Sequence, residues 1–129
     1  MLFFNYNTTM KNVAILGAST NQSRMSHKAQ LLLRDKGYMP IPINPSAEMV
    51  DGVTCYPDLL SCPMTINTVV VYVRPAILKS EVGAIIHANP QRVILNPGTE
   101  DKLSIRRLEQ ADIEVEAACT LVLLNTGQF

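Results

Sequence analysis

Short apolar runs alternate along the chain with segments in which apolar residues recur every three or four positions. The first run, residues 13–16 (VAIL), is continuous, which is typical of a strand buried on both faces of a parallel sheet. The next segment has apolar residues at helical spacing and is followed by Gly37. We therefore expect a helix over about residues 25–36, with Ser23 and Ser26 as candidate N-caps.

The same alternation continues toward the C-terminus, with turn-forming residues between the elements. The segment 68–73 is the strongest strand signal, because it combines five β-branched residues with Tyr72. Glu100 and Asp101 open the last helical segment, and acidic side chains favour a helix N-terminus. The pattern predicts further strands at 41–43, 53–56, 68–73, 93–95 and 113–115 and further helices at about 77–88 and 100–108, followed by a tail from Cys119 to Phe129.

This order of strands and helices is typical of right-handed βαβ units, which build a mostly parallel sheet between two layers of helices. We predict an α/β fold, a single Rossmann-like three-layer domain with a mostly parallel sheet of five to six strands. The length of 129 residues and the 47% hydrophobic content suit one compact domain. We assign this domain to residues 12–129 and regard residues 1–11 as an N-terminal arm.

The charge balance limits the classes of partner. Eleven basic and eleven acidic residues give a net charge of zero, which excludes the broad positive field that non-specific binding to nucleic acid or anionic membranes requires. Residues 1–95 nevertheless carry eight basic and five acidic side chains, an excess compatible with one local anion site. No apolar run approaches the roughly 20 residues of a membrane span. We expect a cytoplasmic protein with a small-molecule partner, and we leave homo-oligomerisation open.

The chain offers few residues for metal binding or catalysis. Its three cysteines lack C-x-x-C spacing, and only His27 and His87 could complement them, so we expect no metal site. His87 falls near a predicted helix end, where a cation has a structural role. Nothing in the pattern pairs a nucleophile such as Cys119 with a base. We therefore predict that the protein is not an enzyme.

Four loops at the predicted strand ends hold the candidate binding residues. In parallel sheets of this kind, ligands bind beyond the carboxyl ends of the strands, near the point where strand order reverses. The four loops contain small residues, amide and hydroxyl side chains and arginine, and no Asp or Glu. They are residues 17–24 (GASTNQSR), 44–46 (NPS), 74–75 (RP) and 96–98 (NPG).

The first of these loops suits a diphosphate. Gly17 can adopt backbone angles that other residues avoid, and Ala18 and Ser19 leave room for close approach. The following helix directs free N–H groups and the positive end of its dipole at the loop, and Arg24 could add a forked contact. The alternative is that Gly17 only makes a tight turn and Arg24 is solvated. The G-x-G-x-x-G fingerprint of dinucleotide sites is not matched.

The end of the second strand disfavours NAD. An NAD site normally has an acidic residue about 20 positions after the glycine loop, where it holds the ribose 2′-hydroxyl. Here that strand ends in Asn44-Pro45, which is neutral. A ligand with an additional phosphate on the ribose would fit this neutral end better, although Asn44-Pro45 could also be a plain turn.

Taken in order, these loops resemble a known family. The segments that carry the resemblance are Gly17-Ala18-Ser19 with Asn21, Arg24 and Ser26; Gly37-Tyr38; Ile43-Asn44-Pro45; Gly52; Cys55-Tyr56-Pro57-Asp58-Leu59; Val70 to Pro75; Asn96-Pro97-Gly98; and Cys119. The set resembles the small stand-alone CoA-binding protein family, which is similar to the CoA-binding domain of the succinyl-CoA synthetase alpha subunit. One departure is that Ile94 and Asn96 stand where such proteins often have Trp and Gln.

The resemblance implies a Rossmann-like domain that holds coenzyme A. The diphosphate would lie at residues 19–24, the adenosine between Asn44-Pro45 and Arg74-Pro75, and the pantetheine toward Asn96 and Cys119. The chain has no room for the synthetase's second domain, so ligase activity is not implied. The cofactor-binding residues expected on this basis are Gly17, Ala18, Ser19, Thr20, Asn21, Arg24, Ser26, Asn44, Pro45, Arg74, Pro75, Asn96 and Gly98.

Three functions are therefore consistent with the sequence. The first is a non-catalytic protein that binds coenzyme A or an acyl-CoA, with the diphosphate at the loop after the first strand. The second is an NAD(P)-binding protein, either a redox sensor or a small reductase. The third is an interaction domain whose nucleotide pocket is vestigial.

Overall fold

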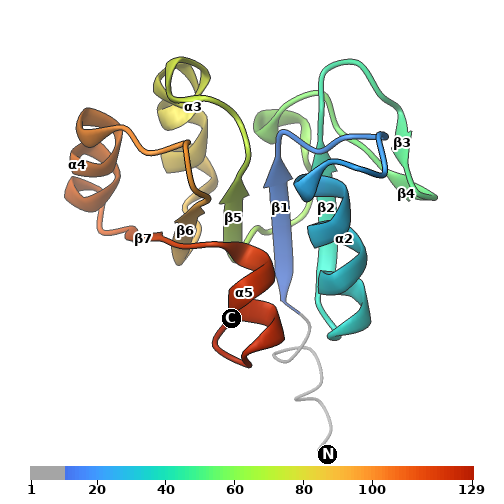
Figure 1. Ribbon diagram of the computed structural model, residues 1–129. Helices are drawn as coiled ribbons and strands as arrows, with labels where there is room; N and C mark the ends of the chain where they lie inside the picture. Colours follow the sequence, from blue (N-terminus) through green and yellow to red (C-terminus); the bar gives the residue numbers. More distant parts are fainter. Residues whose placement is uncertain (1–10) are drawn as a thin grey trace, which may run out of the picture.

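The computed structural model describes residues 11–129, so the predicted N-terminal arm lies outside the described residues except for Lys11. Strands and helices alternate along the chain, and all strands of the main sheet point to the same end of the molecule (Figure 1). The elements are β1 (Asn12–Leu16), α2 (Met25–Asp35), β2 (Met39–Ile43), β3 (Met49–Val50), β4 (Val53–Thr54), the 3-10 turn η1 (Leu59–Ser61), β5 (Thr68–Val71), α3 (Pro75–Ala88), β6 (Arg92–Leu95), α4 (Lys102–Gln110), β7 (Glu114–Ala117) and α5 (Thr120–Asn125).

Five strands form one sheet in the order β2-β1-β5-β6-β7, and every neighbouring pair is parallel. The chain first moves outward from β1 to β2, and then returns past β1 to add β5, β6 and β7 on the other side. Strand order therefore reverses between β1 and β5, whose register pairs Leu16 with Val71. The predicted Rossmann-like α/β fold is confirmed, and its switch point lies at the carboxyl ends of these two strands.

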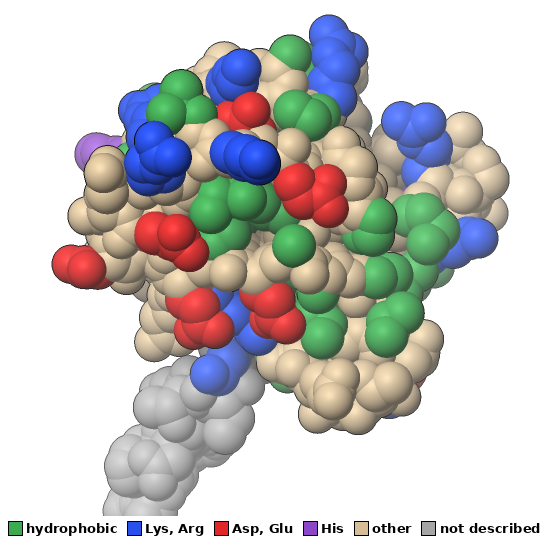
Figure 2. Space-filling view, turned by 60° about the vertical axis from the view of Figure 1, so that its left-hand side comes forward, with side chains coloured by type: hydrophobic (Ala, Val, Ile, Leu, Met, Phe, Trp, Pro, Cys, Tyr) green, Lys and Arg blue, Asp and Glu red, His purple; other side chains and the backbone are tan. Residues whose placement is uncertain are grey.

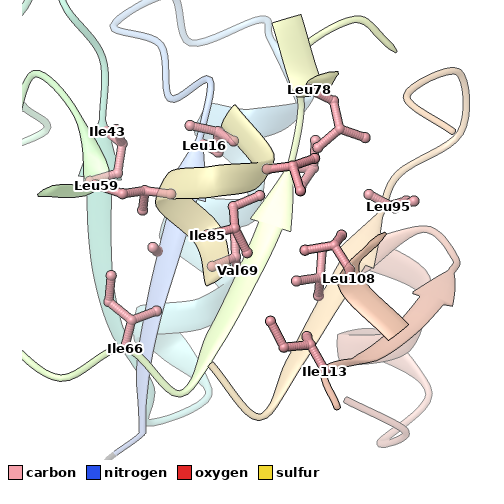
Figure 3. Packing of buried hydrophobic residues seen from close by; sticks show 14 of the residues in the cluster. Leu16, Ile43, Leu59, Ile66, Val69, Leu78, Ile85, Leu95, Leu108 and Ile113 are labelled. Atoms are coloured by element: carbon pink, nitrogen blue, oxygen red, sulfur yellow. The ribbon is translucent and has the colours of Figure 1, made fainter. Parts of the chain in front are cut away.

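Each face of the sheet has its own hydrophobic core, because successive strand residues point to opposite faces. On one face, Leu16 and the neighbouring strand residues pack with Ile85 of α3 and Leu108 of α4 (Figure 3). On the other face, the remaining strand residues pack against Leu33 of α2 and Leu123 of α5. In the main sheet, all strands except β7 are thus largely buried on both sides, as the continuous apolar runs predict.

The predicted strand at 53–56 is not part of the main sheet. Its first half, β4, pairs antiparallel with β3 in a separate two-stranded hairpin. Asp51 and Gly52 have φ values of 50° and 78°, which are the angles that an Asp-Gly hairpin turn requires. Tyr56 makes only a single bridge to β2. The main sheet of the described chain therefore has five strands rather than six.

The segment from 119 to 129, expected to be a tail, contains helix α5, so this expectation was wrong. The helix is only six residues long, too short to give a clear helical period. Its Leu123 is buried against the sheet. The chain then ends with Phe129 packed edge-on to Tyr38, at 5.1 Å between ring centroids, and beneath the Arg92 guanidinium at 4.3 Å. These contacts pack residues 119–129 against the rest of the domain.

Both signs of charge are present on the face of the molecule shown in Figure 2. Most of the basic side chains in that view gather in its upper part, the end toward which the strands point, and the acidic side chains lie mainly below them. Within residues 11–129, none of the helices has the length and apolar character needed to cross a bilayer. The same residues contain no group of three or more His, Cys, Asp or Glu side chains placed to hold a metal ion.

Candidate functional site

A groove lies at the switch point and consists of three adjoining parts. The central cavity has a volume of about 450 Å³ and is lined by Gly17, Ala18, Ser19, Arg24, Asn44, Tyr72, Val73, Arg74 and Ile77. The α2 end has a volume of about 280 Å³, shares Gly17, Arg24 and Tyr72 with the central cavity and adds Ser23, Met25 and Ser26. The apolar slot, of about 180 Å³, shares Gly17, Val73 and Ile77 and adds Leu16, Ile43, Pro45, Pro57, Asp58 and Glu81.

Gly17 lets the chain turn out of β1 close to the segment that follows β5. Its φ is +95°, a conformation that is costly for residues with a Cβ atom. The Gly17 and Ala18 amides both donate to the carbonyl oxygen of Ile43, at 3.2 and 3.1 Å. These two amides are therefore occupied within the fold, and the donors available to a ligand begin at Ser19.

The rest of this loop is held by its own hydrogen bonds. The Asn21 amide donates to Oγ of Ser19 at 3.0 Å, and the Ser23 amide and hydroxyl donate to Oδ1 of Asn21 at 3.0 and 2.7 Å. The Arg24 amide then donates to the Asn21 carbonyl at 3.0 Å. The loop thus reaches helix α2 in a defined conformation before any ligand binds.

Several backbone amides beside the groove have no acceptor among the described residues. Inside the loop these are the amides of Ser19, Thr20 and Gln22. At the start of α2 they are the amides of Met25 and Ser26, which belong to the first turn. Helix N-termini combine such free donors with a positive potential, so this end of the groove is suited to an anion.

Arg24 and Arg74 occupy equivalent positions at two helix N-termini. Arg24 is the N-cap residue of α2 and Arg74 that of α3, and neither side chain makes a capping hydrogen bond. Neither forms an ion pair with any residue in the described part of the chain. A cation is unfavourable at the positive end of a helix, and arginine lacks the side-chain acceptor of a good N-cap. Two such unfavourable residues lining one cavity indicate a site for an anionic ligand.

Asn44 links the ends of β1 and β2. Its Nδ2 donates to the carbonyl oxygen of Ala18 at 2.6 Å, and its Oδ1 accepts from the Ser46 amide at 2.7 Å. The Asn44 amide donates to the Tyr56 carbonyl at 2.9 Å. Because both ends of the side-chain amide are used in this way, Asn44 positions the first loop and has limited capacity to contact a ligand.

The apolar slot differs chemically from the rest of the groove. Hydrophobic and proline side chains form most of its lining, and two carboxylates, Asp58 and Glu81, complete it. Oδ1 of Asp58 accepts from the amide and hydroxyl of Ser61, both at 2.8 Å. Burial raises the pKa of Glu81, and the nearby negative charge of Asp58 raises it further. The groove is therefore positive at its α2 end and negative at the slot.

Tyr72 lines both the central cavity and the α2 end of the groove. Its hydroxyl is buried and has no hydrogen-bond partner in the part of the chain that the structure describes, and the same is true of the Thr120 hydroxyl. Burial raises the pKa of Tyr72 to about 12, a change that nearby Thr120 opposes and Cys119 reinforces. Cys119 is the N-cap residue of α5 and lines none of the three parts of the groove.

Eight of the thirteen predicted binding residues line the groove. They are Gly17, Ala18, Ser19, Arg24, Ser26, Asn44, Pro45 and Arg74. Thr20 and Asn21 belong to the first loop but face solvent, and Pro75 is the first residue of α3. Ser26, expected as a candidate N-cap, is instead buried in the first turn of α2, and Ser23 lies one residue before the N-cap.

Asn96 and Gly98 do not line the groove. Asn96 is buried, its Nδ2 donates to the Val71 carbonyl at 3.0 Å, and its Oδ1 accepts from the Thr120 amide at 2.9 Å. Its side chain thus connects β5 to α5. The Gly98 amide donates to the Glu100 side chain at 2.9 Å in an exposed turn. In this structure the Asn96 side chain stabilises the fold, and Gly98 forms part of a surface turn.

Some lining residues were missed by sequence reasoning. Tyr72 and Val73 directly follow β5 and would have been found if that strand had been ended at Val71. Asp58 belongs to a segment that carries the family resemblance but was not among the predicted binding residues. Glu81 gave no signal, because it lies well inside α3 and reaches the slot only through the packing of that helix. Their place in the groove depends on tertiary structure.

A comparison with known protein families shows which family this chain belongs to. A family model described as a CoA binding domain matches residues 11–125. This chain belongs to that family. The match includes every element of the CoA binding domain from β1 to α5, and the resemblance found in the sequence is confirmed. A comparison with curated proteins gives no match.

Solved structures agree with the family assignment. The CoA binding domain is similar to an uncharacterised protein of known crystal structure, with 33% identity and a TM-score of 0.84 over 93% of this chain and 98% of that one. It is also similar to the protein cell-free ID.343 from Thermus thermophilus, with 27% identity and a TM-score of 0.86 over 97% and 95% of the two chains.

A larger enzyme contains the same fold. The dinucleotide forming acetyl-coenzyme A synthetase 1 of Ca. Korarchaeum cryptofilum matches with 21% identity and a TM-score of 0.74. The alignment covers 84% of the CoA binding domain and 25% of the synthetase chain. At this identity the similarity concerns the fold alone.

Proposed function

We propose that this CoA binding domain binds coenzyme A or an acyl-CoA in the groove without catalysing a reaction. The observation that carries the proposal is the pair Arg24 and Arg74, two unpaired N-cap cations that line one cavity. A ligand with several phosphate groups would neutralise both guanidiniums through charge-assisted hydrogen bonds. Coenzyme A has a diphosphate and a separate ribose phosphate, and so matches a site with two cations.

The diphosphate fits best at the α2 end of the groove. The free amides of Met25 and Ser26 in the first turn of α2 offer backbone donors there, and Arg24 adds a guanidinium. The free amide of Ser19 lies in the adjoining central cavity. Backbone donors at a helix N-terminus with one nearby arginine are a common arrangement for phosphate recognition. Arg74, at the start of α3, remains for the ribose phosphate in the central cavity.

The alternative of an NAD(P)-binding protein receives less support. The end of β2 is Asn44, whose side-chain amide is already bonded to Ala18 and Ser46. It is therefore a poor partner for a ribose 2′-hydroxyl, which NAD sites usually bind through a free carboxylate. The third alternative, a vestigial pocket, does not account for two unpaired arginines that stand at unfavourable positions and line one cavity.

The absence of catalysis is proposed from the chemistry of the groove lining. Among the described residues, the groove is lined by neither histidine nor cysteine. His27 is buried within α2 and His87 is exposed in the last turn of α3. A nucleophile and a base within hydrogen-bond reach of each other, which covalent catalysis needs, are not brought together there.

Isothermal titration calorimetry with coenzyme A, acetyl-CoA, NAD and NADP tests the proposal. We expect the two CoA ligands to bind and the two nicotinamide nucleotides to bind weakly or not at all. Binding of NAD or NADP without binding of coenzyme A would instead support the nicotinamide alternative. Binding of none of the four would support the vestigial pocket.

A further inference from the structure

Two carboxylates, those of Asp58 and Glu81, line the apolar slot. The rest of its lining is mostly apolar, and it includes Leu16 and Ile43, which also belong to the hydrophobic core (Figure 3). Neither carboxylate forms an ion pair with any residue that the structure describes. Two negative charges without a cation are unfavourable in such surroundings, because apolar side chains do not replace the water that an ionised carboxylate loses.

Glu81 is the less stabilised of the two carboxylates. Oδ1 of Asp58 accepts hydrogen bonds from the amide and hydroxyl of Ser61, both at 2.8 Å, whereas the Glu81 carboxylate accepts none from the described residues. Burial raises the pKa of Glu81 above its usual value of 4.5, and the negative charge of Asp58 raises it further. The slot therefore disfavours the ionised form of Glu81 even before a ligand binds.

The elements around the slot bring no cation into it. Arg74, the N-cap residue of α3, lines the central cavity and not the slot. Lys79 of α3 is paired with Asp101 of α4 at 3.8 Å. Strands β1, β2 and β5 contain no charged residue. The segment that passes through η1 adds no charged residue besides the slot carboxylate, and its other titratable side chains are Cys55, Tyr56 and Cys62. The charge in the slot thus depends on its own two carboxylates and on the ligand.

A bound anion makes the ionised form of Glu81 still less favourable. The slot opens into the central cavity, because Gly17, Val73 and Ile77 line both. A phosphate group beside Arg74 in that cavity adds a negative charge next to the slot, and the ligand displaces water from the mouth of the slot. Both effects oppose the ionised carboxylate and leave the protonated carboxyl nearly unaffected. The ligand therefore binds the protonated form better, and by linkage it strengthens proton binding by the same factor.

We propose that ligand binding in the groove is coupled to protonation of Glu81 by a proton from solvent, so that coenzyme A binds more tightly in mildly acidic than in neutral solution. The inference rests on the proposed function and adds its regulation. Affinity is highest where Glu81 is already protonated in the free protein. It falls as the pH rises through the range in which the free protein has lost this proton and the complex still holds it. Above that range Glu81 is charged in both states, and the affinity stays at its lower value.

The test is calorimetry with coenzyme A on the full chain, at about pH 5 and about pH 7.5, with wild type and Glu81→Gln. Between the higher and the lower pH, the affinity of the wild type should rise by about threefold or more relative to that of the variant. At the higher pH the variant should bind about threefold or more tightly than the wild type, whereas removal of a group that contacts the ligand favourably would weaken binding. Histidines and the phosphate monoester of the ligand also titrate in this range, but they contribute equally to both proteins.

The number of protons taken up on binding provides a second measurement. Calorimetry at about pH 6 in two buffers of different ionisation enthalpy should show that the wild type takes up more protons per coenzyme A than Glu81→Gln does. Glu109→Gln, at an exposed position on α4, is the matched control and should behave as the wild type. Equal pH dependence and equal proton uptake in wild type and Glu81→Gln would overturn the coupling while leaving CoA binding intact. Binding of coenzyme A at neither pH would overturn both proposals.

Discussion

A Cβ atom at Gly17 would lie 3.0 Å from Cγ1 of Val73. It would also lie 3.1 Å from the backbone carbonyl carbon of Tyr72, which cannot move aside as a side-chain tip can. The loops after β1 and β5 therefore approach each other as closely as a glycine allows. This close approach brings Arg24 and Arg74, which follow these two loops, to the same cavity.

Substitution of Gly17 should damage both the fold and the site. We expect Gly17→Ala to lower the free energy of unfolding by about 1–3 kcal/mol, because the positive φ and the close contact both become strained. Affinity for coenzyme A should fall as well, since the two loops must separate. Urea denaturation and calorimetry measure the two effects.

Gly98→Ala is the matched control for this prediction. Gly98 also has a positive φ, +92°, but a Cβ there would meet nothing within 4 Å, and the residue lies outside the groove. The variant should lose stability through backbone strain of about 1–2 kcal/mol while binding coenzyme A as the wild type does. If both variants bound equally well, the contact between Gly17 and Val73 would have no bearing on the site.

Replacement of Arg24 should change stability and binding in opposite directions. Arg24→Ser provides α2 with a good N-cap and removes a cation from its positive end, so we expect a gain of about 1 kcal/mol in the free energy of unfolding. Affinity for coenzyme A should fall by about 1–3 kcal/mol through loss of the charge-assisted contact. Thermal denaturation without ligand and calorimetry with ligand measure the two changes.

Arg107→Ser is the control for a general loss of positive charge. Arg107 lies in the last turn of α4, where a cation is favourable, so this variant should be slightly less stable and should bind coenzyme A normally. An Arg24→Ser protein that is more stable and still binds coenzyme A with unchanged affinity would show that Arg24 points to solvent.

Asn96 should prove important for stability and much less so for direct ligand contact. Its side chain connects the Val71 carbonyl to the Thr120 amide and is buried. We expect Asn96→Ala to lower the free energy of unfolding by about 1–3 kcal/mol, because the buried Thr120 amide loses its partner. The Val71 carbonyl then keeps only the 3.4 Å hydrogen bond from the backbone amide of residue 96. Urea denaturation measures this loss, and calorimetry at low temperature should show nearly normal affinity for coenzyme A in the folded fraction. A stable variant with abolished binding would contradict this assignment.

The sequence predicts most of the fold because its signals are local. The strand runs 13–16, 69–71 and 93–95 are continuously apolar, and burial on both faces of a parallel sheet explains this directly. Helix α5 has only six residues and is held by the burial of Leu123 and Leu124, which a local pattern does not reveal. The β3–β4 hairpin has a local signal in its Asp51-Gly52 turn, but its strands of two residues each are too short to show an alternating pattern.

The site is less predictable than the fold, for a physical reason. Gly17, Arg24 and Arg74 were found because strand ends and helix starts determine where they lie. Asn96 also follows a strand, yet its hydrogen bonds turn it inward to α5. Glu81 reaches the slot from within a helix. Tertiary contacts decide whether a side chain at a strand end points into the groove or packs inside the domain.

Glu81 should also make the stability of the ligand-free protein depend on pH. Its pKa is raised above the usual value of 4.5, mainly by burial and further by Asp58, so the folded state binds the proton more tightly than the unfolded state. The stabilisation from this group is therefore present below about pH 4.5 and is lost as the pH rises through the pKa of the folded state. Glutamine at this position does not titrate and avoids the burial of a charge.

Urea denaturation of wild type and Glu81→Gln at about pH 4 and about pH 7 tests this expectation. The variant should gain stability relative to the wild type between the lower and the higher pH, because only the wild type then carries the disfavoured charge. Glu109→Gln, at an exposed position on α4, controls for removal of a surface carboxylate. A stability difference between wild type and Glu81→Gln that is the same at both pH values would show that the Glu81 carboxylate is solvated in the folded protein, and would contradict this prediction.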